Sequence, residues 1–141
     1  MKLIFCLTLS FSSYFLYGQC SYYPSTGVLA ECNVTYTFYK AAQYDYDFRR
    51  SSNGTYLKTS VKISINEGKG TILVYWYDTG RKDKYVINFA YREKETSDFF
   101  FTVEGNSNLL MKLTKRQKNG AIYAFELMSV KDNSAVAFFN N

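Results

Sequence analysis

The chain has no histidine, the side chain that most often acts as a general base near neutral pH. Sites in which a histidine activates a serine or cysteine nucleophile are therefore excluded. Only one proline and eight glycines are present, so long disordered segments are not expected. The three cysteines include no CxxC pair, and neither a metal site nor a cofactor is expected.

The first eighteen residues have the pattern of a secretory signal peptide. Lys2 precedes an apolar run, Leu3–Leu9, and the segment ends at the small residue Gly18. Several serines dilute the run, which is too short for a membrane anchor, so no transmembrane segment is expected in the mature chain. Cleavage near Gly18 predicts a secreted or periplasmic protein. A lipid anchor at Cys20 is the alternative.

Removal of this segment leaves two cysteines, Cys20 and Cys32. In an oxidising compartment such a pair predicts a disulfide, which would stabilise the fold by about 3 kcal/mol. The bond would pin residues 19–33, which hold the only proline and are expected to form an irregular lead-in. Residues 34–141 are expected to form one all-β domain.

Aromatic residues make up 19% of the chain, with fourteen tyrosines and twelve phenylalanines, a composition that favours strands. The stretch Val61–Tyr91 alternates apolar and polar residues and predicts three strands joined by two-residue turns that begin at Gly68 and Gly80. These turns would set Trp76 opposite Val61 on one side and opposite Tyr85 on the other. Trp76 would then lie at the centre of one apolar face.

The same alternation extends in both directions from this stretch. Upstream it predicts strands at residues 34–39 and 44–49, with a helical turn at residues 41–43 between them. Downstream, with Phe89 set opposite Phe101 and Leu113 opposite Phe125, it predicts a meander of seven strands from Tyr56 to Phe139. The fold class is therefore all-β, a single antiparallel meander of about eight or nine strands.

The second face of this meander also carries apolar residues, among them Leu73, Tyr75, Val86 and Phe100. A sheet with two apolar faces needs cover on both, which indicates a curled sheet or a small barrel. A signal peptide followed by such a meander resembles the lipocalin and fatty-acid-binding superfamily in outline. The resemblance implies a lipocalin-like barrel, although the sole tryptophan lies in a middle strand and not in a Gly-x-Trp motif near the first.

Two sets of aromatic residues are candidate binding sites. A closed barrel of eight or more strands can hold a small apolar molecule. The residues expected to line such a site are Trp76, Tyr85, Phe89, Phe101 and Tyr123. Exposed tyrosines could instead bind a protein or a sugar, since tyrosine suits both kinds of surface. The candidates for this surface are Tyr39, Tyr44 and Tyr46.

Because the chain has no histidine, carboxylates are the remaining candidates for catalytic groups. Asp45 and Asp47 would share one strand face, and Asp78 and Asp83 would flank a turn. A glycosidase-type hydrolase needs just two acids at a fixed separation. Acids at such positions are more often ordinary solvated residues, and the protein is not expected to be an enzyme.

The formal net charge of +5 is mild, although the chain has 17 lysines and arginines. They gather in two expected turns, at residues 81–84 and 115–118, where such charges more often keep strands from pairing with other chains. Nucleic acid is therefore not an expected partner. Asn33 and Asn53 begin glycosylation motifs that have meaning only in a eukaryotic source.

These observations favour a secreted or periplasmic, non-enzymatic binding module whose partner is a protein or a glycan. A carrier of a small apolar ligand within the barrel is the alternative, and a carboxylate-based hydrolase is the third hypothesis.

Overall fold

The computed structural model describes residues 15–17, 20–44, 54–115 and 122–140, which form ten strands of one antiparallel sheet. Within these ranges there is no helix, and so none that could cross a membrane. The strands are β1 (Phe15–Tyr17), β2 (Cys20–Tyr22), β3 (Leu29–Tyr44), β4 (Thr55–Asn66), β5 (Lys69–Trp76), β6 (Arg81–Arg92), β7 (Phe99–Val103), β8 (Asn106–Lys115), β9 (Ile122–Ser129) and β10 (Ser134–Phe139).

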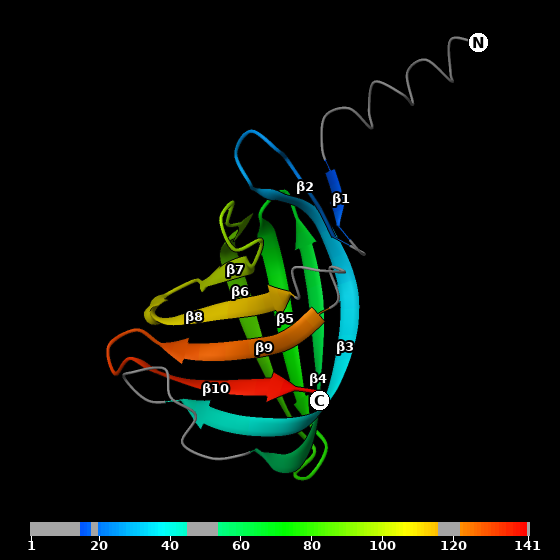
Figure 1. Ribbon diagram of the computed structural model, residues 1–141, viewed down its shortest axis with the longest axis vertical. Coiled ribbons are helices and arrows are strands. Elements are labelled where there is room, and N and C mark those ends of the chain that lie inside the picture. The colour runs from blue at the N-terminus through cyan, green and yellow to red at the C-terminus, as the bar shows by residue number, and fades with distance from the viewer. Residues whose placement is uncertain (1–14, 18–19, 45–53, 116–121, 141) are drawn as a thin grey trace, which may run out of the picture.

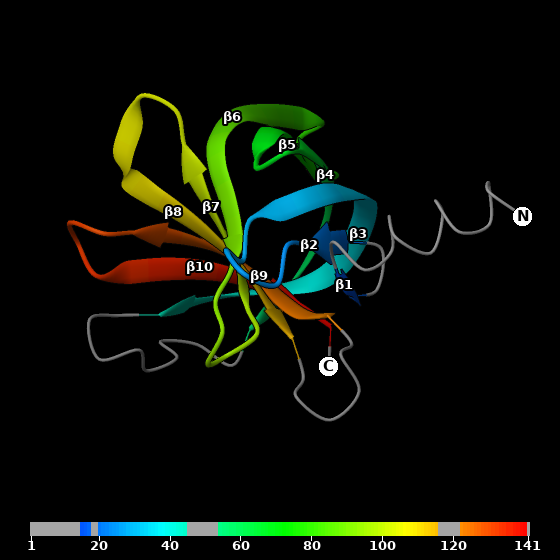
Figure 2. The same ribbon diagram turned by 90° about the horizontal axis from the view of Figure 1, so that it is seen from above.

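Eight of the strands close into a barrel. Strands β4 to β10 pair in chain order, and β3 pairs with both β4 and β10. In Figure 1 the strands β4–β6 run across the direction of β8–β10, and β3 bends along the side of the barrel to meet both groups. Figure 2 shows the same arrangement from above. The predicted all-β antiparallel meander is confirmed, and its sheet closes into a barrel.

The side chain of Asn140 helps to complete the junction between β10 and β3. Its Oδ1 accepts a hydrogen bond from the Tyr39 backbone N–H at 3.0 Å, and its Nδ2 donates to the Thr37 carbonyl at 2.9 Å. The amide thus takes the place of a strand residue at a point where β10 has already ended.

Strand β3 is longer than the sequence predicts. The expected helical turn at residues 41–43 is wrong, because these residues pair with β10, for example Ala42 with Ala137. Ala41 and Ala42 are only 8% and 3% exposed, so pairing and burial outweigh the high helix propensity of alanine. Of the expected strand at 44–49, Tyr44 ends β3 and residues 45–49 lie outside the described residues.

The barrel interior is filled with large side chains. Five phenylalanines from four strands are at most 2% exposed, and each such burial contributes about 2 kcal/mol. They are Phe38, Phe99, Phe101, Phe125 and Phe138.

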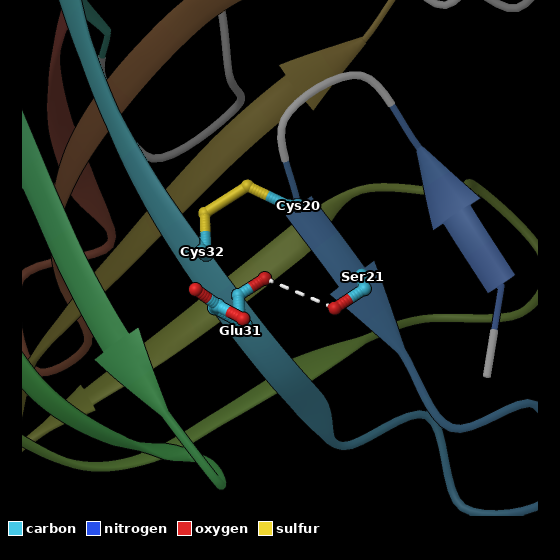
Figure 3. The surroundings of a disulfide bond; sticks show 4 residues. All are labelled: Cys20, Ser21, Glu31 and Cys32. Carbon is cyan, nitrogen blue, oxygen red and sulfur yellow. Dashed lines mark hydrogen bonds between the residues drawn. A yellow bond between two sulfur atoms is a disulfide. The ribbon is translucent and has the colours of Figure 1, made fainter. Parts of the chain in front are cut away.

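The predicted disulfide joins β2 to β3. Cys20 lies directly opposite Cys32, both are almost fully buried, and Figure 3 shows the bond between the two strands. Beside it, the Ser21 hydroxyl donates a hydrogen bond to the Glu31 carbonyl at 3.3 Å. The segment expected to be an irregular lead-in, residues 19–33, therefore contains β2 and the start of β3, because these two strands pair with each other from the disulfide-bonded cysteines onward.

The first predicted turn is shifted by one position. Glu67 and Gly68 form it, with φ values of 52° and 77°, and they leave Val61 opposite Val74 rather than Trp76. Two successive positive φ values are the requirement of a type I′ hairpin turn. The Gly68 N–H also donates to the Leu29 carbonyl at 2.7 Å, which holds this turn against the start of β3.

The second predicted turn is wrong by a larger margin. Residues 77–80 form a four-residue loop, closed by a hydrogen bond from the Gly80 N–H to the Trp76 carbonyl at 2.8 Å. Trp76 therefore lies opposite Arg81 and not Tyr85, at the end of β5 and of the barrel. Both registers are shifted by an even number of residues, so each side chain in β5 still faces the predicted side.

A bulge in β6 changes the side on which one aromatic ring lies. The pairing shifts between Ile87 and Phe89, so Ala90 lies opposite Phe101 and faces the core with 0% exposure. Phe89 is 45% exposed, and the predicted pair of Phe89 with Phe101 is wrong. The later pair of Leu113 with Phe125 is confirmed.

Candidate functional site

The outer side of β4, β5 and β6 carries a cluster of lysines and tyrosines. Thr59 and Val61 are 0% exposed and point into the barrel, so the residues that alternate with them point outward. The register places the outward residues of the three strands side by side. We define the Lys–Tyr face as six of these neighbours: Lys58, Lys62, Tyr75, Tyr77, Lys82 and Lys84.

Direct contacts within the Lys–Tyr face join its tyrosines to its lysines. The Lys58 ammonium lies 4.4 Å from the centre of the Tyr77 ring, and that of Lys82 lies 5.8 Å from the Tyr75 ring. The two rings meet edge to face, with centres 4.6 Å apart. Such cation–π contacts fix the lysine stems over the sheet while the charges stay near the surface.

The charge of this surface has one sign. Among the described residues of β4–β6, no outward position holds a carboxylate, because Asp83 belongs to the inward set with Trp76. Four ammonium groups therefore share one surface without an acid between them. Their mutual repulsion raises the energy of the unoccupied surface, and an anion would lower it.

A hollow of about 270 Å³ lies at one end of the Lys–Tyr face. Its lining residues are Tyr56, Leu57, Lys58, Tyr77 and Asp78. Tyr56 is 75% exposed and stands at the rim. The carboxylate of Asp78 accepts a hydrogen bond from the Thr79 backbone N–H at 2.8 Å, which holds it in the turn. The hollow thus combines two aromatic rings, one ammonium and one carboxylate.

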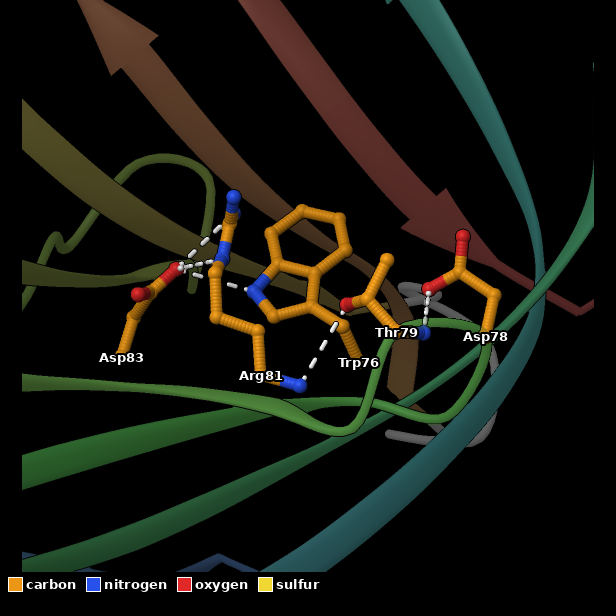
Figure 4. Close-up of polar contacts among 5 residues, drawn as sticks. All are labelled: Trp76, Asp78, Thr79, Arg81 and Asp83. Atoms are coloured by element: carbon orange, nitrogen blue, oxygen red, sulfur yellow. Dashed lines mark hydrogen bonds and ion pairs between the residues drawn. The ribbon is translucent and has the colours of Figure 1, made fainter.

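A separate polar cluster lies at the same end of the barrel on the inward side. The Trp76 indole N–H donates to Asp83 Oδ2 at 2.9 Å, and the Arg81 guanidinium bonds the same oxygen at 3.1 Å. Arg81 also lies over the indole ring at 4.7 Å, and Figure 4 shows these three side chains together. The Trp76 ring packs against Phe138 at 5.3 Å. These contacts hold the tryptophan in place and give Asp83 a structural role.

The residues predicted to line an apolar ligand site are not gathered around one space. Phe101 is fully buried in the core, while Trp76 and Tyr85 are half-buried at its margin. Burial, and after it the neighbouring Asp83 carboxylate, raises the pKa of Tyr85. Phe89 lies outside, with its ring 5.2 Å from that of Tyr91, and Tyr123 is 37% exposed.

The predicted surface tyrosines are also separated. Tyr39 is 46% exposed and lies beside the Lys–Tyr face, with the Lys58 ammonium 5.9 Å from its ring. Tyr44 is half-buried and packs with a small cluster that includes Phe139. Tyr46 lies outside the described residues.

Of the candidate catalytic acids, Asp78 and Asp83 lie within the described residues, and both make structural contacts. Asp45 and Asp47 lie outside the described residues. Asp78 holds the turn and Asp83 holds Trp76 and Arg81, as described above. Within the described ranges, no three acids or cysteines lie together as metal ligands would.

One lysine is buried at the end of β8. Lys115 is 6% exposed, and its ammonium lies 3.4 Å from the centre of the Phe99 ring. Burial, and after it the Arg92 guanidinium, lowers the pKa of Lys115 to about 7, against the opposing effect of the Asp98 carboxylate. Lys115 therefore belongs to the folded core and not to an exposed basic turn.

The largest of the described hollows, about 540 Å³, lies beside the turn between β7 and β8. Its lining mixes amides and hydroxyls with aliphatic groups and includes no charged side chain; Asn88, Thr102, Asn106 and Val130 are among its residues. It offers hydrogen bonds to a ligand but no group that could transfer a proton near neutral pH.

Sequence reasoning did not single out the Lys–Tyr face. The signal was present as alternation, since Lys82 and Lys84 share one side of a strand with Val86. The interpretation of the charges at residues 81–84 as turn charges hid it, although the two-residue turn predicted at Gly80 leaves both lysines in the following strand. Comparisons of the chain with protein-family models, with curated protein sequences and with solved structures found no match.

Proposed function

We propose that this protein is a secreted or periplasmic, non-enzymatic binding module that contacts its partner through the Lys–Tyr face. The observation that carries the proposal is the group of four outward lysines around two tyrosines, with no carboxylate among the outward residues described in β4–β6. Aromatic rings and unpaired charges on an exposed surface favour recognition of a partner of opposite charge.

Protection of a sheet edge does not account for these lysines. Lys82 and Lys84 lie in β6, which pairs with β5 on one side and β7 on the other. A strand inside a closed barrel has no open edge to protect against pairing with other chains. Solubility alone would be served equally well by lysines mixed with acids.

The filled interior favours surface binding over transport of an apolar ligand. An eight-stranded barrel is just wide enough to be filled by side chains or to hold one small ligand. Here Phe101, Phe125 and Phe138 are 0% exposed in the interior, together with aliphatic residues of similar burial. Among the described residues, these side chains occupy space that a carrier would keep open.

The disulfide supports the proposed location. Cross-links such as that between Cys20 and Cys32 persist in oxidising compartments and are rare in the cytosol. Cleavage after Gly18 would remove β1 and leave β2 and the barrel intact, because β1 pairs only with β2.

The proposal is tested with protein purified from its own host and with two matched double variants. K62Q/K84Q removes two charges from the Lys–Tyr face, and K94Q/K131Q removes two exposed charges from turns elsewhere. Retention of a component of the host's extracellular or envelope fraction is measured by biolayer interferometry. We expect K62Q/K84Q to lose retention and K94Q/K131Q to keep it.

Equal retention by both variants would overturn the proposed contact surface. Native mass spectrometry of the same preparation tests the alternative. A small lipid or pigment that remains bound to the purified chain would favour the carrier.

A further inference from the structure

Resting on the proposed function, we propose that the Lys–Tyr face binds an acidic polysaccharide. The lysines would pair with carboxylate or sulfate groups along the sugar chain, and the hollow at Tyr56, Tyr77 and Asp78 would receive the hydroxyl groups of one sugar unit. Four features of the surface favour this ligand over other polyanions.

The first feature is the spacing of the charges. Leu73 of β5 lies directly opposite Lys62 of β4 on one side and opposite Lys84 of β6 on the other. Two interstrand spacings separate them, about 10 Å, while Lys58 and Lys62 are about 13 Å apart along β4. Charges spread in this way match single anionic groups distributed along an extended chain. They do not converge on one phosphate.

The second feature is the state of the tyrosine rings. The Lys58 ammonium lies over the Tyr77 ring, and the rings of Tyr75 and Tyr77 meet edge to face. Binding of single-stranded nucleic acid relies on open ring faces on which bases stack. Here the ring faces are partly occupied, and the groups left for a ligand are ring edges and hydroxyls. Tyrosine hydroxyls both donate and accept hydrogen bonds, as recognition of sugar hydroxyls requires.

The third feature is the acid in the hollow. Asp78 lines it together with Lys58. A carboxylate accepts hydrogen bonds from sugar hydroxyls, whereas it repels the phosphates of a nucleic acid. The hollow of about 270 Å³ therefore suits a neutral part of an otherwise acidic ligand.

The fourth feature is the small apolar content of the surface. A basic surface that inserts into a lipid bilayer also presents protruding apolar side chains. Leu73, between Lys62 and Lys84, is half-buried, and the exposed aliphatic side chain next to Lys84 on the outer side of β6 is Val86, which is 46% exposed. An anionic lipid surface would gain charge contacts here but would bury little aliphatic area beyond that of Val86.

The experiment measures binding of the folded, disulfide-bonded chain to defined probes. Polygalacturonate supplies a carboxylate on each sugar, dextran supplies uncharged sugar, and polyglutamate supplies carboxylates without sugar. Oligo-dT and phosphatidylglycerol vesicles represent the other two polyanions. We expect polygalacturonate to bind most tightly at equal ionic strength and dextran not to bind.

Three variants locate the contact. K62Q/K84Q should weaken polygalacturonate binding about tenfold, the factor for roughly 1.4 kcal/mol, while K94Q/K131Q changes it less than about twofold. Tyr56→Ala alters the hollow without changing the charge. Because the Tyr56 side chain is 75% exposed, its removal should have little effect on stability. It should weaken binding of polygalacturonate about threefold and leave polyglutamate binding unchanged. Circular dichroism confirms that each variant is folded.

The outcomes separate this inference from the proposed function. Polyglutamate, oligo-dT or vesicles could bind more tightly than polygalacturonate, with K62Q/K84Q weakening that binding. This result would overturn the acidic polysaccharide as the ligand and retain the Lys–Tyr face as the contact surface. Equal weakening by K62Q/K84Q and K94Q/K131Q would overturn both. An unchanged affinity of Tyr56→Ala for polygalacturonate would show that charge alone acts, and would overturn recognition of the sugar.

Discussion

Replacing Lys115 with methionine should stabilise the protein near neutral pH. In the folded chain the pKa of this lysine falls from 10.5 to about 7, because burial and the Arg92 guanidinium disfavour the ammonium form. In the unfolded chain the lysine keeps its proton up to its ordinary pKa. Above about pH 7 the unfolded state therefore binds more protons than the folded state, and the free energy of unfolding of the native chain rises with pH.

The magnitude follows from linkage between protonation and folding. With one pKa unit equal to about 1.4 kcal/mol, the cost of holding Lys115 in its site is at most about 4 kcal/mol at pH 7 and about 2 kcal/mol at pH 9. Methionine has an unbranched chain that suits the same space without the charge. Lys115→Met should thus gain most at pH 7 and should lose the rise in stability between about pH 7 and pH 9.

Urea unfolding followed by circular dichroism at pH 7, 8 and 9 measures this effect. Burial also raises the pKa of Tyr36 and Tyr85, so these groups titrate above the chosen window. Lys112→Met is the control, because the Lys112 ammonium pairs with the Glu126 carboxylate at 3.1 Å on the outside of the barrel. It should keep the pH dependence of the native chain. Equal slopes for Lys115→Met and the native chain would refute the argument from burial.

Four further changes test the fold. Gly70→Ala should cost about 3 kcal/mol or more in thermal unfolding, since a Cβ there would lie 1.9 Å from a backbone oxygen of β4. Gly80→Ala has open space and should cost only about 1–2 kcal/mol from its positive φ, so equal losses would contradict the close approach at Gly70. Replacing Cys20 and Cys32 by serine should lower the free energy of unfolding by about 3 kcal/mol, and detection of reactive thiols at both cysteines in the native chain would disprove the bond. Phe101→Ala should cost about 3–5 kcal/mol, whereas a loss below about 1 kcal/mol would reveal room for a ligand beside it.

Alternation in the sequence predicts which side of the sheet a residue faces better than it predicts its partner. Val61 and Ile63 face the core as predicted, although each lies opposite a residue two positions from the predicted one. The pattern repeats every two residues, so registers that differ by an even number satisfy it equally. The turn geometry decides among these registers, and Glu67 adopts a positive φ, which is uncommon for glutamate and could not be predicted from the residue type.

The bulge beside Phe89 was not predictable for a related reason. One extra residue in β6 places Ala90 in the core and turns a phenylalanine outward, against the ordinary preference for burial of the larger ring. Ala90 then lies opposite Phe101, and this contact exists only once β6 and β7 are paired.

The Lys–Tyr face depends on tertiary structure in the same way. The sequence places Lys82 and Lys84 on one side of a strand, but Tyr75 comes from β5 and Tyr77 from the loop after it, and Lys58 and Lys62 come from β4. A one-residue slip at either turn would send one of these sets into the core.

By itself, the sequence determined the class of fold, the chain order of the seven strands from Tyr56 to Phe139 and the pairing of Cys20 with Cys32. These features follow from local alternation, from turn residues and from simple counting. The tertiary structure alone decided that the sheet closes through β3, that Trp76 lies at the end of the barrel and that the lysines of β4 and β6 share one surface. Closure and register depend on contacts between residues far apart in the chain, and those contacts leave no periodic signal in the sequence.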